Sequence, residues 1–218
     1  MLKKFLVLGA VLLLATAAHA QEKHAFENEV RNLVLQDSLI KNRKDLILFT
    51  GSSSIRMWAD LEKDFPRKNV LNRGFGGSTM RDLLYFADQL IIPYQPKTIF
   101  IYEGDNDIAL GRESQEILAS ADSLLNLIRT HLPKTLKVYF IAAKPSVARW
   151  HLKDQYIAFN NELKTWTQSR KNVYFIDVWS PMLHADGSLK KELFLEDGLH
   201  MNRSGYTIWR NQIRKHLK

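Results

Sequence analysis

The sequence contains no cysteine, so disulfide bonds cannot contribute to its stability in any compartment. It also lacks internal repeats, low-complexity segments and any stretch that resembles a flexible linker. These absences exclude a disulfide-stapled scaffold and a repeat architecture. The chain is nevertheless long enough to bury a large hydrophobic core as one domain.

No concentrated basic stripe is present, although the formal net charge is +8. The excess lysine and arginine is spread over short separate runs, such as KNRK, PKTLK and RKHLK. A nucleic-acid-binding protein usually gathers its basic residues on one surface with interleaved aromatic residues. We therefore predict a basic, solvated surface and no nucleic-acid partner, with a weak attraction to anionic envelope polymers left open.

Residues 1–20 have the pattern of a secretory signal peptide. They begin with MLKK, continue with fourteen residues, FLVLGAVLLLATAA, and end with AHA. The apolar run is shorter than the roughly 20 residues of a membrane span, which disfavours an uncleaved anchor. We expect cleavage near Ala20, a single domain over 21–218, and a secreted or periplasmic protein without stable membrane insertion.

Short apolar runs alternate with amphipathic segments along the rest of the chain. The runs predict strands at 46–50, 69–74, 98–104, 137–143 and 173–178. The amphipathic segments predict helices at 25–41, 78–90, 113–132, 153–169 and 204–217. Near-continuous apolar strands are typical of a sheet buried on both faces. The alternation predicts an α/β domain with a parallel sheet between two layers of helices.

Polar motifs stand directly after the predicted strands, where ligands bind in open parallel sheets. The motifs are, in chain order, GSSS, GFGGS, EGDND and AAKPSVARW, and EDGLH lies beyond the last strand. The glycine motif matches a dinucleotide-binding fingerprint poorly, because the third glycine is missing and the motif follows the second strand. This disfavours a nucleotide-binding protein of the same architecture.

A serine, a histidine and an aspartate in these motifs suggest acyl transfer. Asp197 and His200 are three residues apart, which lets the carboxylate accept the Nδ1 proton of the imidazole. A serine at a tight strand-to-helix turn is exposed, and its N–H favours a developing oxyanion. Each motif alone also fits a helix cap or surface pair, but four in this order favour a catalytic site.

The same motifs resemble those of the SGNH (GDSL-type) esterase/lipase superfamily. GSSSI stands where the family has Gly-Asp-Ser, and NRGFGGST, EGDND and DGLH resemble its glycine, Gly-x-Asn-Asp and Asp-x-x-His blocks. The resemblance implies a flavodoxin-like, three-layer α/β/α sandwich with five parallel central strands. It also implies hydrolysis of acyl esters without a metal or cofactor.

Matching the blocks residue by residue gives the site that the resemblance implies. Ser53 is the nucleophile, His200 is the general base, and Asp197 orients His200. The oxyanion would be held by the N–H groups of Ser53 and Gly77 and by the Asn106 side chain.

The match departs from the family pattern at one position, where Ser52 replaces the usual aspartate. The register of the serine run is therefore open, with Ser54 as the second candidate nucleophile and Ser52 as the third.

Residues beside the motifs are candidates for substrate contact. Arg149 and Trp150 follow the fourth strand and are expected at the rim of the site, and a packed surface loop is an equal reading. Arg73, Phe75 and Glu103 adjoin motif residues and are similar candidates.

We predict a serine esterase that cleaves short acyl esters, with acetyl esters of carbohydrates as one candidate class. The alternatives are a lysophospholipase or thioesterase of the same family, or a binding protein that keeps the fold without turnover. The expected partner is a small acyl-ester substrate, and the sequence indicates neither the alcohol part nor the oligomeric state.

Overall fold

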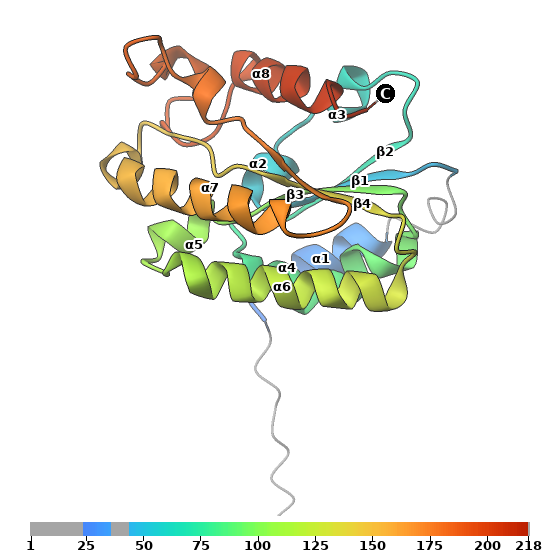
Figure 1. The fold of residues 1–218 in the computed structure, drawn as a ribbon. Coiled ribbons are helices and arrows are strands. Elements are labelled where there is room, and N and C mark those ends of the chain that lie inside the picture. Colours follow the sequence, from blue (N-terminus) through green and yellow to red (C-terminus); the bar gives the residue numbers. More distant parts are fainter. Residues whose placement is uncertain (1–23, 36–43, 218) are drawn as a thin grey trace, which may run out of the picture.

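The computed structural model of the protein describes residues 24–35 and 44–217 (Figure 1). The predicted signal peptide at 1–20 lies outside the described residues, as does the end of the first predicted helix, beyond Leu35.

The described chain is built around a parallel sheet of five strands in the order β2-β1-β3-β4-β5. The strands are β1 (Ile47–Gly51), β2 (Val70–Gly74), β3 (Thr98–Tyr102), β4 (Lys137–Ile141) and β5 (Val173–Ile176). This is the flavodoxin-like order, in which the chain changes direction across the sheet between β1 and β3. The predicted α/β/α fold with five parallel strands is therefore confirmed.

Helices cover both faces of the sheet (Figure 1). The first layer holds α1 (Glu27–Leu35), α4 (Met80–Leu90), α6 (Ser114–His131) and α7 (Lys153–Gln168). The second layer holds the short helices α2 (Ser53–Arg56) and α3 (Leu61–Asp64) together with α8 (Arg203–Arg214). A further short helix, α5 (Asp105–Ala109), follows β3. Single 3₁₀ turns occupy Ile92–Tyr94, Trp150–Leu152, Ser180–Met182 and Lys191–Leu193.

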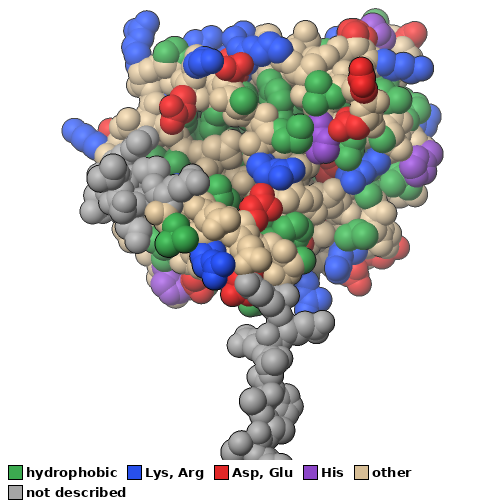
Figure 2. All heavy atoms as spheres, turned by 180° about the vertical axis from the view of Figure 1, so that it is seen from behind, with side chains coloured by type: hydrophobic (Ala, Val, Ile, Leu, Met, Phe, Trp, Pro, Cys, Tyr) green, Lys and Arg blue, Asp and Glu red, His purple; other side chains and the backbone are tan. Residues whose placement is uncertain are grey.

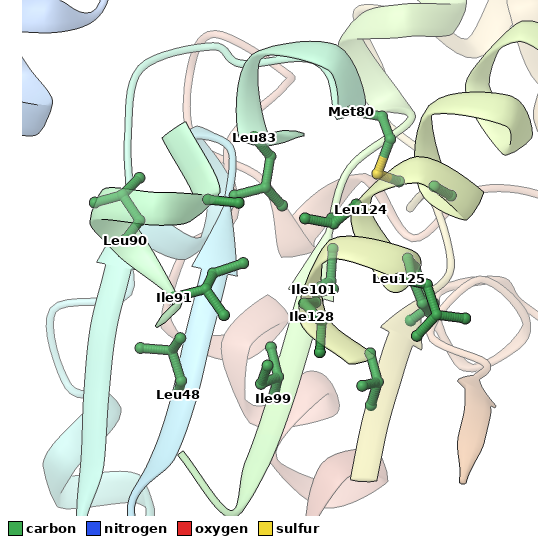
Figure 3. Close-up of a cluster of buried hydrophobic side chains, with 14 of the residues drawn as sticks. Leu48, Met80, Leu83, Leu90, Ile91, Ile99, Ile101, Leu124, Leu125 and Ile128 are labelled. Carbon is green, nitrogen blue, oxygen red and sulfur yellow. The ribbon is translucent and has the colours of Figure 1, made fainter. Parts of the chain in front are cut away.

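The hydrophobic core is divided into two clusters by the sheet, because successive strand residues point to opposite faces. Leu48, Ile99 and Ile101 pack against α4 and α6 (Figure 3). On the other face the rings of Phe49 and Phe100 stack with centroids 4.7 Å apart. Burial on both faces explains why the strands are nearly continuous apolar runs in the sequence.

The start of α4 is held in place by its own residues and by α5. Thr79 and Asp82 form a reciprocal capping box, as expected from the predicted helix start. The Asp107 carboxylate also accepts the N–H of Met80 at 3.1 Å. The first residue of α4 is thereby tied to α5, which follows β3.

The surface carries its basic residues in a dispersed pattern. Figure 2 shows lysine and arginine side chains lying among acidic and hydrophobic ones on the face opposite to the view of Figure 1. In the described part of the chain no helix is both long and apolar enough to cross a membrane.

Gly51 ends β1 in a conformation that other residues rarely adopt. Its φ is +125°, and a Cβ atom there would lie 2.0 Å from the carbonyl oxygen of Tyr102 on the neighbouring strand. Backbone strain of this kind costs about 1–3 kcal/mol, and the overlap with a strand backbone adds to it. We therefore expect Gly51→Ala to lower the free energy of unfolding by about 3 kcal/mol or more, measured by urea denaturation.

Gly187→Ala is the matched control for this substitution. Gly187 also has a positive φ, of +81°, but among the described residues no heavy atom beyond its two chain neighbours lies within 4 Å of the position of its Cβ. The Gly187→Ala substitution should therefore lower the free energy of unfolding only by the contribution from backbone strain. Equal losses in the two variants would show that the close approach to Tyr102 is unimportant.

Candidate active site

The serine run forms the turn between β1 and α2. Ser52 is the N-cap residue of α2, and Ser53 is the first residue of the helix. The N–H of Ser52 donates to the carbonyl oxygen of Tyr102 at 3.1 Å. The Tyr206 hydroxyl donates to the carbonyl oxygen of Ser54 at 2.9 Å. Bonds to two distant elements thus hold this turn. Ser53 is half-buried, whereas the two flanking serines are buried.

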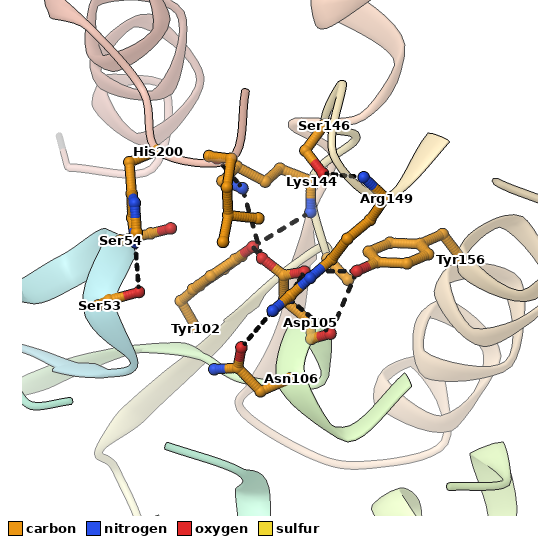
Figure 4. Close-up of polar contacts among 12 residues, drawn as sticks. Ser53, Ser54, Tyr102, Asp105, Asn106, Lys144, Ser146, Arg149, Tyr156 and His200 are labelled. Atoms are coloured by element: carbon orange, nitrogen blue, oxygen red, sulfur yellow. Dashed lines mark hydrogen bonds and ion pairs between the residues drawn. The ribbon is translucent and has the colours of Figure 1, made fainter. Parts of the chain in front are cut away.

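His200 contacts both Ser53, as Figure 4 shows, and Asp197. Its Nε2 atom lies 2.9 Å from Ser53 Oγ, and its Nδ1 atom lies 2.6 Å from Asp197 Oδ2. An ionised carboxylate only accepts hydrogen bonds, so Nδ1 carries the proton and Nε2 is free to accept one from a hydroxyl. Among the three serines it is the Ser53 hydroxyl that contacts His200, the serine that the family resemblance implies.

The surroundings of the Asp197 carboxylate favour its ionised form. Its burial, although slight, acts to raise its pKa. Hydrogen bonds from the His200 ring and from the N–H groups of Leu199 and His200 outweigh this and lower the pKa of Asp197 to about 2. A charged carboxylate at Nδ1 stabilises the imidazolium that forms when Nε2 takes a proton.

The loop that carries Asp197 and His200 is held by a bond within itself and by a bond to the segment after β4. Within the loop, the N–H of Leu195 donates to the carbonyl oxygen of His200 at 2.8 Å. The N–H of Ala148 donates to the carbonyl oxygen of Gly198 at 3.0 Å. The orientation of the imidazole therefore depends on contacts between segments far apart in sequence.

The predicted oxyanion donors follow three neighbouring strands. Gly51 is in register with Gly74 and with Tyr102, so β1, β2 and β3 end at the same level. A Cβ atom on Gly77 would lie 3.8 Å from the side-chain nitrogen of Asn106, so these two donors are adjacent. Within residues 24–35 and 44–217, the N–H groups of Ser53 and Gly77 have no protein acceptor. Both remain available to a ligand.

Three of the predicted substrate contacts lie in the interior of the protein. Arg73, Phe75 and Glu103 are 5%, 0% and 2% exposed, respectively. The Phe75 ring packs edge-on against Phe26, with centroids 5.4 Å apart. The Arg73 guanidinium donates to the Tyr94 hydroxyl at 3.2 Å. Substrate contact by these residues does not fit their burial, because a side chain within the core cannot touch a ligand bound at the surface.

Arg149 lies beside the site, where it contacts Asn106, whereas the recorded ring contact of Trp150 is with Trp179. The Arg149 guanidinium donates to the side-chain oxygen of Asn106 at 2.9 Å. The Trp150 ring is half-buried and parallel to the ring of Trp179, with centroids 6.1 Å apart. Direct contact of Arg149 or Trp150 with substrate stays a prediction.

Lys144 is a residue of the site that the sequence did not reveal. It is 0% exposed, and its Nζ atom donates to the carbonyl oxygen of Leu199 at 2.8 Å. Burial lowers the pKa of Lys144, and the charge of Asp105 opposes that change. The sequence signal that could have identified Lys144 is its position directly after the apolar run that contains β4. A lysine that is fully buried there needs a partner.

No group of three or more histidine, aspartate or glutamate side chains in the described segments is arranged to hold a metal ion.

Comparison with known proteins identifies relatives with this architecture. The model of the GDSL-like Lipase/Acylhydrolase family matches residues 37–208. Platelet-activating factor acetylhydrolase IB subunit alpha2 of Gallus gallus is 25% identical over 175 residues, covering 76% of this chain and 73% of the relative.

Two solved structures share the fold at low sequence identity. A GDSL-like lipase from Bacteroides thetaiotaomicron has a TM-score of 0.72 at 18% identity, covering 86% of this chain and 96% of its own. An acetylxylan esterase from Geobacillus stearothermophilus, in the form of a catalytic mutant, has a TM-score of 0.66 at 15% identity. It covers 82% of this chain and 96% of its own.

Proposed function

We propose that this protein cleaves short acyl esters by a Ser-His-Asp mechanism. The chain belongs to the GDSL-like Lipase/Acylhydrolase family and hydrolyses ester bonds. The observation that carries the proposal is the continuous chain of contacts from Ser53 Oγ through the His200 ring to the Asp197 carboxylate. Such a chain activates a hydroxyl that is otherwise a weak nucleophile at neutral pH.

In the first half of the reaction, Ser53 Oγ attacks the ester carbonyl carbon while His200 Nε2 takes the hydroxyl proton. The N–H groups of Ser53 and Gly77 and the Asn106 amide hold the negative charge on the former carbonyl oxygen. The tetrahedral intermediate then collapses. The bond to the alcohol oxygen breaks, His200 gives its proton to that oxygen, and an acyl-Ser53 ester remains.

In the second half, a water molecule attacks the acyl-Ser53 carbonyl carbon while His200 Nε2 removes a proton from it. The same donors hold the second oxyanion. Its collapse releases the carboxylic acid, and His200 returns the proton to Ser53 Oγ. Asp197 stays ionised throughout, as its lowered pKa allows.

The proposal of a short acyl group has support from the relatives, whose names refer to acetyl esters: a platelet-activating factor acetylhydrolase and an acetylxylan esterase. Acetyl esters of carbohydrates are therefore one substrate class to test for this chain. The alternatives are a lysophospholipase or thioesterase, which would favour a long acyl chain, and a binding protein without turnover.

Steady-state kinetics on p-nitrophenyl esters from acetyl to dodecanoyl distinguishes these possibilities. We expect kcat/KM to be highest for acetyl or propionyl and to fall with each longer chain. A value that rises with chain length would favour the lysophospholipase alternative. The absence of any turnover that depends on Ser53 would overturn the proposed activity and favour the binding protein.

We also propose that the protein acts outside the cytoplasm. The support is the signal-peptide pattern of residues 1–20. N-terminal sequencing of the protein after expression in a bacterial host tests this, with Gln21 expected as the first residue. Retention of residues 1–20 in the cytoplasmic fraction would contradict it.

A further inference from the structure

A buried polar cluster lies beside the candidate site, and the mechanism above does not use it (Figure 4). We call it the Asp105 cluster. Its members come from β3, α5, the segment after β4 and α7, and they are Tyr102, Asp105, Lys144, Arg149 and Tyr156. Four of the five side chains are 5% exposed or less, and the Arg149 side chain is 18% exposed.

The carboxylate of Asp105 is the centre of the cluster. It accepts hydrogen bonds from the hydroxyls of Tyr102 and Tyr156. It also forms ion pairs with Lys144, at 3.3 Å, and with Arg149. Burial acts to raise the pKa of Asp105, but the charges of Lys144 and Arg149 outweigh it and hold the pKa well below its ordinary value. The carboxylate therefore stays charged and keeps both cations in place.

Arg149 extends from this centre to the oxyanion side of the site. Besides its bonds to Asp105, the guanidinium donates to Asn106 Oδ1 at 2.9 Å. Asn106 Nδ2 then faces the other way and donates to the carbonyl oxygen of Ser78 at 2.9 Å. A flipped amide would place its NH₂ group against the guanidinium, and neither group can accept a hydrogen bond. Arg149 thus determines which end of the Asn106 amide faces the site.

Lys144 extends from the same centre to the general-base side. Its ammonium group donates to the carbonyl oxygen of Leu199 at 2.8 Å. Leu199 immediately precedes His200, and its own N–H donates to Asp197 at 2.8 Å. The ammonium therefore holds the peptide unit between the two residues of the Asp-x-x-His motif.

We propose that the Asp105 cluster is a positioning unit for catalysis, in which Arg149 orients the Asn106 amide and Lys144 fixes the loop that carries His200. This inference rests on the proposed function and deepens it. It assigns roles to two residues that need not touch substrate. It also explains why two cations and one anion are buried together, an arrangement whose desolvation cost makes it a weak source of stability.

A double-mutant cycle tests the Arg149 part of the proposal. We expect Arg149→Met to lower kcat by about 10- to 100-fold with little change in KM, which is less than the complete loss of an oxyanion donor. If Arg149 acts through Asn106, the same substitution should have almost no further effect in an Asn106→Ala background. Equal losses in both backgrounds would overturn this role.

Arg170→Met is the matched control. Arg170 also pairs with an aspartate, Asp122, at 2.8 Å, and its side chain is 23% exposed. Arg170 lies just before β5, at the end of the sheet where the parallel strands begin, whereas the site lies where they end. We expect unchanged kcat in this variant. A loss equal to that of Arg149→Met would mean that removing any such ion pair lowers activity, and would overturn the proposal.

The NMR resonances of the Asn106 and His200 side chains report on the proposed positioning without any catalytic turnover. We expect the Asn106 amide signals in ¹H–¹⁵N spectra to move in Arg149→Met and to stay in place in Arg170→Met. In Lys144→Met the ¹⁵N shifts of the His200 imidazole, which report its tautomer, should move. If Lys144→Met does not fold, Lys144→Gln replaces it, because an amide can still donate to Leu199, and smaller shifts of the same resonances are then expected. Folded Lys144 and Arg149 variants with unchanged resonances would overturn the proposal.

These outcomes separate the inference from the function on which it rests. Wild-type protein without turnover that depends on Ser53 would contradict the proposed esterase, whatever the resonances show. Turnover that depends on Ser53, with additive losses in the cycle and unmoved resonances, would leave the esterase standing and overturn only the positioning role.

Discussion

Replacing Ser53 by alanine is expected to lower kcat for ester hydrolysis by about 10⁴- to 10⁶-fold. The variant keeps all three oxyanion donors, since alanine retains the backbone N–H of residue 53, but it has no oxygen to attack the carbonyl carbon. Some catalysis over water should remain, because these donors still stabilise an oxyanion formed by direct attack of water. Hydrolysis of p-nitrophenyl acetate under saturating conditions measures the loss.

The two flanking serines provide matched controls with the same change in composition. Ser54 is 2% exposed and Ser52 is 1% exposed, and the His200 ring contacts neither of their hydroxyls among the described residues. We expect Ser54→Ala and Ser52→Ala to keep kcat within about tenfold of the wild type. An inactive Ser54→Ala variant beside an active Ser53→Ala variant would mean that the register of the nucleophile is wrong.

Replacing Asp197 by asparagine is expected to lower kcat by about 10²- to 10⁴-fold. The amide can present its NH₂ group to the imidazole, which would favour the proton on Nε2, where it blocks attack by Ser53. It also carries no charge to stabilise the imidazolium. The largest loss of kcat in this range applies to a buried aspartate. The Asp197 side chain is 47% exposed, so water can partly replace the carboxylate and reduce the loss. The rate on p-nitrophenyl acetate measures the effect.

Asp177→Asn is the control for this substitution. Asp177 is exposed and lies in the loop after β5, where its carboxylate accepts the N–H of Ser180 at 3.0 Å. Among the described residues, Asp177 forms no hydrogen bond with the His200 ring. We expect no measurable change in kcat. A similar loss of activity in both variants would argue against a specific role for the carboxylate at Nδ1.

The strands and long helices were predictable because their signals are local. The apolar run of β3 was expected at 98–104 and is observed at Thr98–Tyr102. The difference arises because Gly104 has a φ of +106° and turns the chain into α5. The short helix α5 was not among the predicted helices. A helix of five residues is too short to show a hydrophobic period.

The chemistry of the candidate site was also open to sequence reasoning. The serine, glycine, asparagine and histidine motifs stand directly at or beyond strand ends, and all parallel strands present those ends at one edge of the sheet. The resemblance of GSSSI to the family's Gly-Asp-Ser block favoured Ser53, and the structure places its hydroxyl 2.9 Å from His200. The flavodoxin-like arrangement was implied only by the resemblance to a known family, since hydrophobic periodicity says nothing about which strands are neighbours.

The sequence by itself therefore predicted the fold class and the strand positions, because hydrophobic periodicity is a property of neighbouring residues, and the resemblance of its motifs to a family named the candidate reacting groups. Only the tertiary structure decided that Arg73 and Phe75 are buried, that Arg149 contacts Asn106 and that Lys144 contacts Leu199. These last two contacts join residues 43 and 55 positions apart in sequence. Such distances are set by the packing of loops from different strands, which no local pattern records.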